Sequence, residues 1–201
     1  MQTIYKLLNL IKNHLHLNNF REKKRGEEAL DLIITRNKIL NNRKLKIAEI
    51  GVFRGDFSAV MLEKFKFFEV ELTLIDPYIA NSEFIDYSQD LLDKAYNFCC
   101  NRFKKFSNVK IIKDSSENSV KNFEDNYFDF IYLDGNHNYS YVKQDLEMWY
   151  PKLKNKGIIC GDDWSRPYGV MKAATEFAYK NNLYISLTNN YENFFFIKDN
   201  N

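Results

Sequence analysis

Cysteine is scarce in this chain of 201 residues, which has three: the adjacent pair Cys99 and Cys100, and Cys160. Their number and spacing provide neither a disulfide framework nor a set of zinc ligands, which indicates a reducing compartment. Long apolar runs are missing too, because Lys6 and Lys12 interrupt the apolar stretch at the N-terminus. We therefore expect no secretory signal, no membrane span and a protein of the cytoplasm.

An excess of charge of one sign is also absent. The 29 Lys and Arg residues nearly balance the 27 Asp and Glu residues, which leaves a formal net charge of +2. This balance gives no electrostatic reason to expect nucleic acid or a membrane surface as a partner, and it favours small molecules. With 45% hydrophobic residues the chain has enough apolar material for a core, and its length favours one main domain.

The order of apolar segments predicts an α/β domain behind a helical extension. Residues 1–43 carry apolar side chains at helical spacing, over 1–20 and 27–40, and we interpret them as a lead-in or a lid. Over residues 44–201, short apolar runs alternate with helical segments, as in a parallel sheet. The expected strands are 45–51, 70–76, 109–114, 128–135 and 157–163, and the expected helices are 57–67, 88–106, 115–123, 140–153 and 170–181. Two final strands, 183–189 and 193–199, should pair antiparallel.

Acidic residues stand at the ends of the predicted parallel strands. They are Glu49, Asp76, Asp114, Asp134, and the pair Asp162 and Asp163. An open, doubly wound sheet binds its ligand outside the carboxyl ends of its strands. Because like charges that lie close together repel unless a cation, a donor or a proton intervenes, we expect a ligand or a metal ion at this edge.

The first of these strand ends carries the segment EIGVFRGDFS, residues 49–58. Gly51 and Gly55 permit a tight turn, and the start of the following helix offers free N–H groups to a ligand. The spacing differs from the G-x-G-x-x-G fingerprint of dinucleotide-binding proteins, which argues against a nicotinamide-dependent oxidoreductase. A plain glycine turn, with Asp56 or Ser58 capping the helix, is the alternative interpretation.

The next two strand ends offer groups that suit a nucleoside. Asp76, followed by Pro77 and Tyr78, can accept hydrogen bonds from both hydroxyls of a ribose, although Asp-Pro is also a common turn. The segment Asp114-Ser115-Ser116 after the third strand provides either an N-cap for the helix that follows or groups that contact an adenine ring.

The fourth and fifth strand ends carry the groups most suited to chemistry. Asp134 and His137 follow one strand, and Asp162 and Asp163 end its predicted neighbour. Three carboxylates suit a hard divalent cation such as Mg²⁺, and a histidine beside them can exchange protons near neutral pH. The alternative is that these residues form a turn and helix caps.

Together these residues resemble a class I S-adenosylmethionine-dependent methyltransferase over about residues 45–199. The chain is most similar to the metal-dependent small-molecule O-methyltransferases, especially the macrocin-type enzymes that methylate sugar hydroxyls. Their pattern includes Leu-Asp-Gly-x-His, an Asp-Asp pair and a following Gly-Val, which corresponds here to Gly169 and Val170. The resemblance implies a Rossmann-like, doubly wound sheet of seven strands in the order 3-2-1-4-5-7-6, with strand 7 antiparallel.

The resemblance also implies a role for each matching residue. Glu49, Gly51 and Gly55 fall at the methionine end of the cofactor, Asp76 at the ribose, and Asp114 with Ser115 at the adenine. The full set of implied cofactor residues is Glu49, Gly51, Val52, Phe53, Gly55, Ser58, Asp76, Pro77, Tyr78, Asp114, Ser115, Ser116 and Asp134. Asp134, Asp162 and Asp163 fall at the Mg²⁺ ion, and the implied catalytic residues are Asp134 and His137, with His137 as general base.

The sequence therefore predicts a Mg²⁺-assisted O-methyltransferase that uses S-adenosylmethionine and acts on a hydroxyl of a sugar, nucleotide-sugar or related polar metabolite. Removing the hydroxyl proton makes the oxygen a nucleophile, and a metal ion can stabilise the alkoxide. Two alternatives stay open: an acceptor that is a catechol-like aromatic diol, and a non-catalytic member that binds the cofactor. A homo-oligomer is compatible with the sequence.

Overall fold

The computed structural model describes residues 27–39, 44–80, 87–165, 168–189 and 191–199. The helix expected over 1–20, and with it most of the predicted lead-in, lies outside these residues. The strands are β1 (Lys44–Ile50), β2 (Glu69–Ile75), β3 (Val109–Ile112), β4 (Phe128–Leu133), β5 (Leu153–Gly161), β6 (Ser186–Leu187) and β7 (Phe194–Ile197). The helices are α2 (Glu27–Ile39), α3 (Asp56–Lys64), α4 (Gln89–Phe103), α5 (Ser116–Ser119), α6 (Tyr139–Trp149) and α7 (Tyr168–Asn181), with short 3₁₀ turns η2 (Val120–Asn122) and η3 (Tyr150–Lys152).

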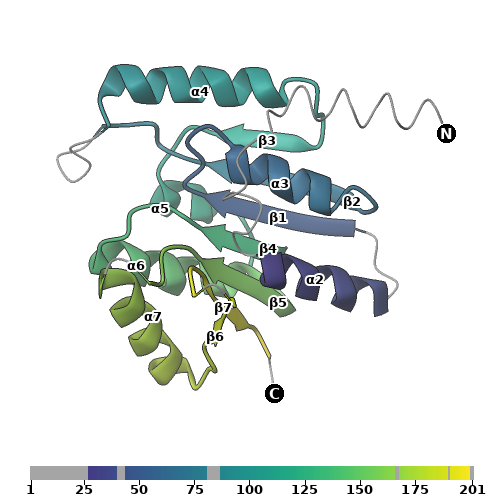
Figure 1. The fold of residues 1–201 in the computed structure, drawn as a ribbon, viewed down its shortest axis with the longest axis vertical. Helices are drawn as coiled ribbons and strands as arrows, with labels where there is room; N and C mark the ends of the chain where they lie inside the picture. The colour runs from purple at the N-terminus through teal and green to yellow at the C-terminus, as the bar shows by residue number, and fades with distance from the viewer. Residues whose placement is uncertain (1–26, 40–43, 81–86, 166–167, 190, 200–201) are drawn as a thin grey trace.

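The strands form one mixed sheet in the order β3-β2-β1-β4-β5-β7-β6 (Figure 1). Strands β1 to β5 pair in parallel, whereas β7 runs antiparallel to both β5 and β6. The predicted fold class, strand order and antiparallel final strand are therefore confirmed.

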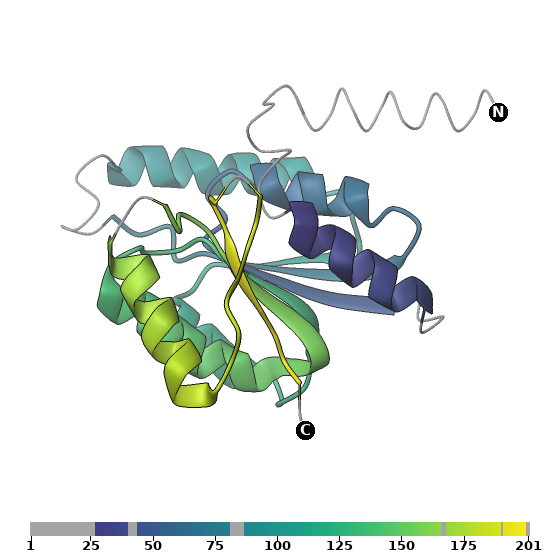
Figure 2. The same ribbon diagram turned by 60° about the horizontal axis from the view of Figure 1, so that its bottom comes forward.

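Helices cover both faces of the sheet, which explains why its central strands are apolar throughout. All six residues of β4 are buried, as expected for a parallel strand with a helix layer on each side. Figure 2 shows α2, α3 and α4 on one face and α6 and α7 on the other. Leu30 of α2 and Phe57 of α3 are buried in the first layer, and Trp149 of α6 and Ala173 of α7 in the second.

Several elements are shorter or begin elsewhere than the sequence predicts. The helix expected over 140–153 ends at Trp149, because Pro151 lacks the N–H that would continue it, and β5 begins at Leu153 rather than at residue 157. The strand expected over 183–189 is reduced to two residues, since β6 lies at the edge of the sheet and pairs only with β7.

Hydrogen bonds beyond the strands hold the loops of the carboxyl edge together. The amide of Gly51 donates to the carbonyl of Ile75 at 2.9 Å, and the amide of Asp134 donates to the carbonyl of Ile50 at 2.7 Å. The amide of Asp162 likewise donates to the carbonyl oxygen at the end of β4 at 3.0 Å. The side chains that follow β1, β2, β4 and β5 are thereby brought to one edge. Among the described helices, none is both long enough and apolar enough to cross a membrane.

Candidate active site

A cleft of about 660 Å³ opens at the carboxyl edge of the sheet. Its wall combines the segments after β1, β2, β3, β4 and β5 with one side of α6. The predicted site residues in this wall are Glu49, Gly51, Val52, Phe53, Asp76, Pro77, Ser115, Ser116, Asp134, His137 and Asp163. Most of the residues selected from the sequence therefore meet in one place.

The loop after β1 is shaped by a carboxylate from the next strand. Oδ2 of Asp76 accepts hydrogen bonds from the amides of Val52 and Phe53 at 2.8 and 2.9 Å, and its Oδ1 accepts from the amide of Tyr78 at 2.8 Å. Gly51 and Phe53 have φ angles of 86° and 50°, as this tight turn requires. An ionised carboxylate can accept about four hydrogen bonds. Asp76 can thus hold the loop and still accept from a ligand hydroxyl, and its ribose role stays a prediction.

Glu49 forms a buried acidic part of the cleft wall. Its side chain is only 1% exposed, and it accepts a hydrogen bond from the hydroxyl of Ser58. A buried carboxylate favours a positively charged partner, because the partner offsets the cost of removing the charge from water. This property suits the ammonium group of a methionine moiety, as the resemblance implies.

Four predicted cofactor residues do not line the cleft: Gly55, Ser58, Tyr78 and Asp114. Gly55 packs against the ring of Phe103, which a Cβ atom at Gly55 would approach to 2.5 Å. Tyr78 is fully buried, and burial raises the pKa of its hydroxyl. Asp114 accepts hydrogen bonds from the amide of Ser115 at 2.7 Å and from the side chain of Asn118 at 3.1 Å. The N-cap of α5 is Ser115, whose hydroxyl accepts a hydrogen bond from the amide of Asn118, and the adenine contact stays a prediction.

His137 lies between two carboxylates of the predicted site. Its Nε2 is 3.4 Å from Oδ1 of Asp134, and its Nδ1 is 3.2 Å from Oδ2 of Asp163. Burial of the ring lowers the pKa of His137, but the hydrogen bond and charge of Asp134, together with the charges of Asp163 and Asp162, outweigh burial and raise the pKa. The arrangement is that of a base whose protonated form is stabilised on both sides.

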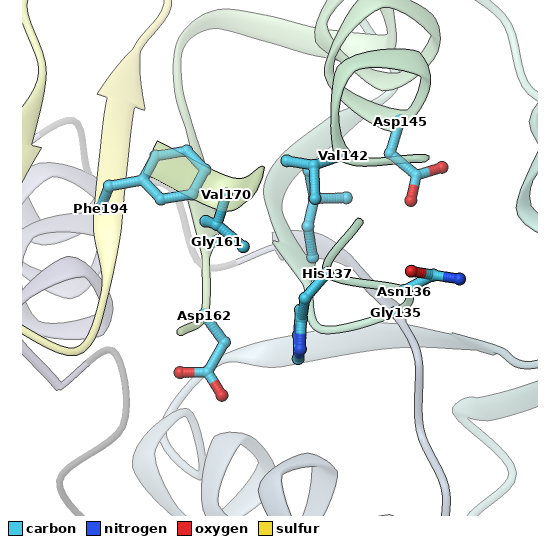
Figure 3. A pocket seen from close by; sticks show the side chains of 10 residues that line it. Gly135, Asn136, His137, Val142, Asp145, Gly161, Asp162, Val170 and Phe194 are labelled. Carbon is cyan, nitrogen blue, oxygen red and sulfur yellow. The ribbon is translucent and has the colours of Figure 1, made fainter. Parts of the chain in front are cut away.

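Asp162 lies deeper than its neighbour Asp163. Its Oδ1 accepts a hydrogen bond from Nδ2 of Asn193 at 2.7 Å, and that amide also contacts the hydroxyl of Tyr132 at 3.0 Å. Asp162, His137 and Phe194 line a second cavity, of only about 10 Å³. Figure 3 shows how these side chains lie. This space holds at most a single water molecule. Asp162 therefore belongs to a buried network behind the cleft.

Comparison with known proteins assigns the family. The sequence profile of a family described as a methyltransferase domain matches residues 48–164, which is more than half of the chain. The chain belongs to this methyltransferase family. The prediction of an S-adenosylmethionine-dependent methyltransferase is thereby confirmed, whereas the finer likeness to macrocin-type enzymes stays a prediction. A search of curated protein sequences gives no match.

Solved structures agree with this family. The O-methyltransferase NovP superposes with a TM-score of 0.66 and 15% identity, covering 88% of this chain and 80% of NovP. The methyltransferase PaMTH1 of Podospora anserina, solved with S-adenosylhomocysteine bound, superposes with a TM-score of 0.62 and 17% identity. The match covers 100% of this chain and 96% of PaMTH1. CalS11, a TDP-rhamnose 3'-O-methyltransferase of calicheamicin biosynthesis, superposes with a TM-score of 0.53 and 15% identity. The match covers 98% of this chain and 93% of CalS11. At these identities the likeness concerns the fold.

The predicted metal site of the methyltransferase does not form in this arrangement. Carboxylate oxygens suit Mg²⁺ chemically. However, the imidazole of His137 occupies the space between Asp134 and Asp163, and Asp162 is bonded to Asn193. Among the described residues, no group of three or more His, Cys, Asp or Glu side chains converges as a metal site. The residues as placed do not fit a metal ion, so we assign it no step.

The sequence analysis missed the contribution of α6 to the site of the methyltransferase. Tyr141, Gln144, Asp145 and Met148 of this helix line the cleft. They stand at positions i, i+3, i+4 and i+7 of a segment that was expected to be helical, shortly after His137. That periodicity was a signal that one side of the helix faces the same edge as the strand ends.

Proposed function

We propose that this methyltransferase transfers the methyl group of S-adenosylmethionine to a hydroxyl oxygen of a sugar or a related polar small molecule. One observation carries the proposal: the imidazole of His137 lies in the cleft wall between the carboxylates of Asp134 and Asp163, at 3.4 and 3.2 Å. Neighbouring carboxylates favour the protonated imidazole, which makes the neutral ring a stronger base. A base at this position serves an acceptor that must lose a proton.

The proposed reaction needs positioning and one proton acceptor. When bound, the cofactor supplies a methyl group on a sulfonium, which is already electrophilic. Transfer of that methyl group to the acceptor oxygen would release S-adenosylhomocysteine, and the hydroxyl proton would pass to Nδ1 of His137, because Nε2 is buried against Asp134. Asp134 and Asp163 then stabilise the imidazolium. Such a transfer would require the acceptor oxygen to be positioned against the methyl group, and it requires no covalent enzyme intermediate.

The wall around His137 favours a polar acceptor. Asn136 and Gln144 lie in the same cleft, and each amide can both donate and accept hydrogen bonds. These groups match the hydroxyls of a sugar, which have the same dual capacity. The fold shared with CalS11, a TDP-rhamnose 3'-O-methyltransferase, supports such an acceptor.

An aromatic diol is the second candidate acceptor, because aromatic side chains also lie at the cleft. The rings of Phe53 and Tyr87 are 5.5 Å apart at an interplanar angle of 55°, and Ile79 nearby in the wall is 64% exposed. A flat apolar ring would remove part of this surface from water. This candidate keeps the reaction and changes only the acceptor.

The test combines binding and turnover on the full chain. S-adenosylmethionine and S-adenosylhomocysteine are titrated calorimetrically into the purified protein, and transfer is then assayed with nucleotide sugars, free sugars and catechols. We expect both cofactor forms to bind and a sugar hydroxyl to accept the methyl group. Transfer to catechols alone would select the second candidate. Absence of cofactor binding, or binding without transfer to any hydroxyl, would contradict the proposal.

A further inference from the structure

A buried carboxyl group that the proposed reaction does not use lies in the cleft wall. Asp145 of α6 is 8% exposed, yet it contributes to the cleft beside the segments that follow β3 and β4. Its Oδ1 accepts a hydrogen bond from the hydroxyl of Ser116, and that hydroxyl in turn accepts one from Nε1 of Trp149 at 2.7 Å. Three side chains from two elements thus form a hydrogen-bonded chain that ends at Asp145.

The direction of this chain follows from the chemistry of its members. The indole nitrogen of Trp149 can only donate, so the hydroxyl of Ser116 accepts from it and directs its one hydrogen toward Asp145. Oδ1 of Asp145 therefore accepts the hydrogen bond from Ser116, and Oδ2 is the oxygen that faces the cleft. The orientation of the carboxylate, and with it the position of Oδ2, is set by Ser116.

Oδ2 points toward the loop after β4. A Cβ atom built on Gly135 would have Oδ2 of Asp145 as its nearest neighbour, at 3.8 Å. Gly135 itself lines the cleft, and its lack of a side chain leaves the space in front of Oδ2 open. Figure 3 shows the carboxylate of Asp145 on the same side of the site as Asn136. An acceptor oxygen is thus held at the cleft wall by the protein.

The electrostatics of the site favour a hydrogen-bond donor from a ligand. Burial raises the pKa of Asp145 to about 6, and the hydrogen bond from Ser116 acts in the opposite direction. At neutral pH the group is ionised at an energetic cost. A buried carboxylate recovers such a cost when an N–H or O–H group donates to it.

We propose that Asp145 recognises the adenine base of the cofactor by accepting a hydrogen bond from its exocyclic amino group. Ser115 and Ser116, at the start of α5, line the part of the cleft that follows β3, where the resemblance implies the adenine, and Ser116 holds Asp145 in that same part of the cleft. The amino group is the hydrogen-bond donor of an adenine ring attached to ribose, and an ionised carboxylate can only accept. The inference rests on the proposed function, because it takes this cleft as the cofactor site.

The experiment compares two ligands that differ only in the base. S-adenosylhomocysteine and S-inosylhomocysteine, which has a 6-oxo group in place of the amino group, are titrated calorimetrically into the full chain. Wild-type protein should bind S-adenosylhomocysteine at least about tenfold more tightly than S-inosylhomocysteine. In the second ligand the 6-oxo oxygen would face Oδ2 of Asp145, and two acceptors cannot form a hydrogen bond with each other. Equal affinity for the two ligands would overturn the inference while leaving the proposed function intact. Absence of binding by both would contradict the proposed function itself.

Two variants test whether the preference for adenine over the 6-oxo base depends on this chain of hydrogen bonds. In Asp145→Asn, the hydroxyl of Ser116 retains the amide oxygen as its acceptor, so the new NH₂ group takes the place of Oδ2. The preference for adenine should then disappear or reverse, because NH₂ donates to a 6-oxo group and opposes an amino group. Ser116→Ala, which frees the carboxylate to rotate, should reduce the preference severalfold. Wild-type discrimination retained in both variants would overturn the inference.

A matched control comes from the same helix. Glu147 is an exposed carboxylate two residues further along α6, paired with Lys180 at 3.1 Å. Glu147→Gln removes one negative charge from α6, as Asp145→Asn does, without altering the cleft. Its preference between the two bases should equal that of the wild type, and a loss as large as that of Asp145→Asn would attribute the effect to net charge and overturn the inference.

Discussion

Gly51 at the end of β1 lies directly against the backbone of Asp134 at the end of β4. A Cβ atom at Gly51 would be 2.1 Å from the carbonyl oxygen of Asp134, far inside contact distance, and Gly51 has a φ angle of 86°. The two strand ends can approach this closely only because one of them carries no side chain. The cleft wall is thereby made continuous from the β1 loop to the β4 loop.

Gly51→Ala should therefore destabilise the protein by about 3 kcal/mol or more, through backbone strain and the steric clash together. Urea unfolding measures the loss. Gly135→Ala is the matched control, since the nearest atom to its Cβ is 3.8 Å away. That change should alter the free energy of unfolding by less than about 1 kcal/mol. Similar stability of the two variants would show that the close approach at Gly51 is not required.

His137→Ala should lower kcat by about 10²–10⁴-fold, the usual contribution of a positioned general base. The affinity for S-adenosylhomocysteine should change little, because the imidazole acts on the acceptor. Steady-state kinetics with saturating cofactor, together with calorimetry, separates the two quantities. A change confined to KM of the acceptor would assign His137 to acceptor binding and remove it from the chemical step.

Asp145 should make the stability of the ligand-free protein depend on pH. Burial raises its pKa from 3.8 to about 6, so the folded protein keeps this proton up to a higher pH than the unfolded chain does. Stability from this group is therefore lost as the pH rises from about 4 to about 6, by on the order of 3 kcal/mol. Urea unfolding of wild type and Asp145→Asn across this range should show the variant gaining relative stability as the pH increases. Parallel profiles would show that Asp145 titrates near its ordinary pKa.

Magnesium dependence stays a prediction from the sequence, and it has a structural consequence. A metal ion bound by Asp134 and Asp163 would displace the imidazole of His137 from between them. The residues as placed do not fit such an ion, so we expect turnover and the ring resonances of His137 in an NMR spectrum to be the same with chelator and with Mg²⁺. Turnover that rises with Mg²⁺, together with shifted His137 resonances, would show that the site rearranges around a metal ion.

The sequence predicted most of the fold because the central strands have a strong signal. Every residue of β4 is buried, and such an apolar run between helical segments is hard to place elsewhere. Its edge was less predictable: β6 has only two residues, and its length depends on pairing with β7 rather than on its own apolar pattern. The helix expected over 140–153 ends at Trp149, and Pro151 was the signal for that end. The prediction ran past it because it followed the helical spacing of the preceding apolar residues.

The candidate site was predictable where it follows strand ends. Glu49, Asp76 and His137 meet in one cleft because parallel strands end at the same edge. The direction of a side chain was not predictable: Ser58 points to Glu49, and Asp162 points to Asn193 behind the cleft. These orientations depend on contacts between residues far apart in the sequence.

The central claim is methyl transfer from S-adenosylmethionine to a hydroxyl oxygen. The most direct measurement uses a cofactor whose methyl group is labelled with ¹³C and follows the label by NMR in a mixture of sugar-nucleotide and catechol acceptors. The account predicts that the label appears as an O-methyl group on a sugar acceptor with wild-type enzyme and is greatly reduced with His137→Ala. Label on nitrogen, carbon or sulfur, or an unaltered yield with His137→Ala, would contradict it.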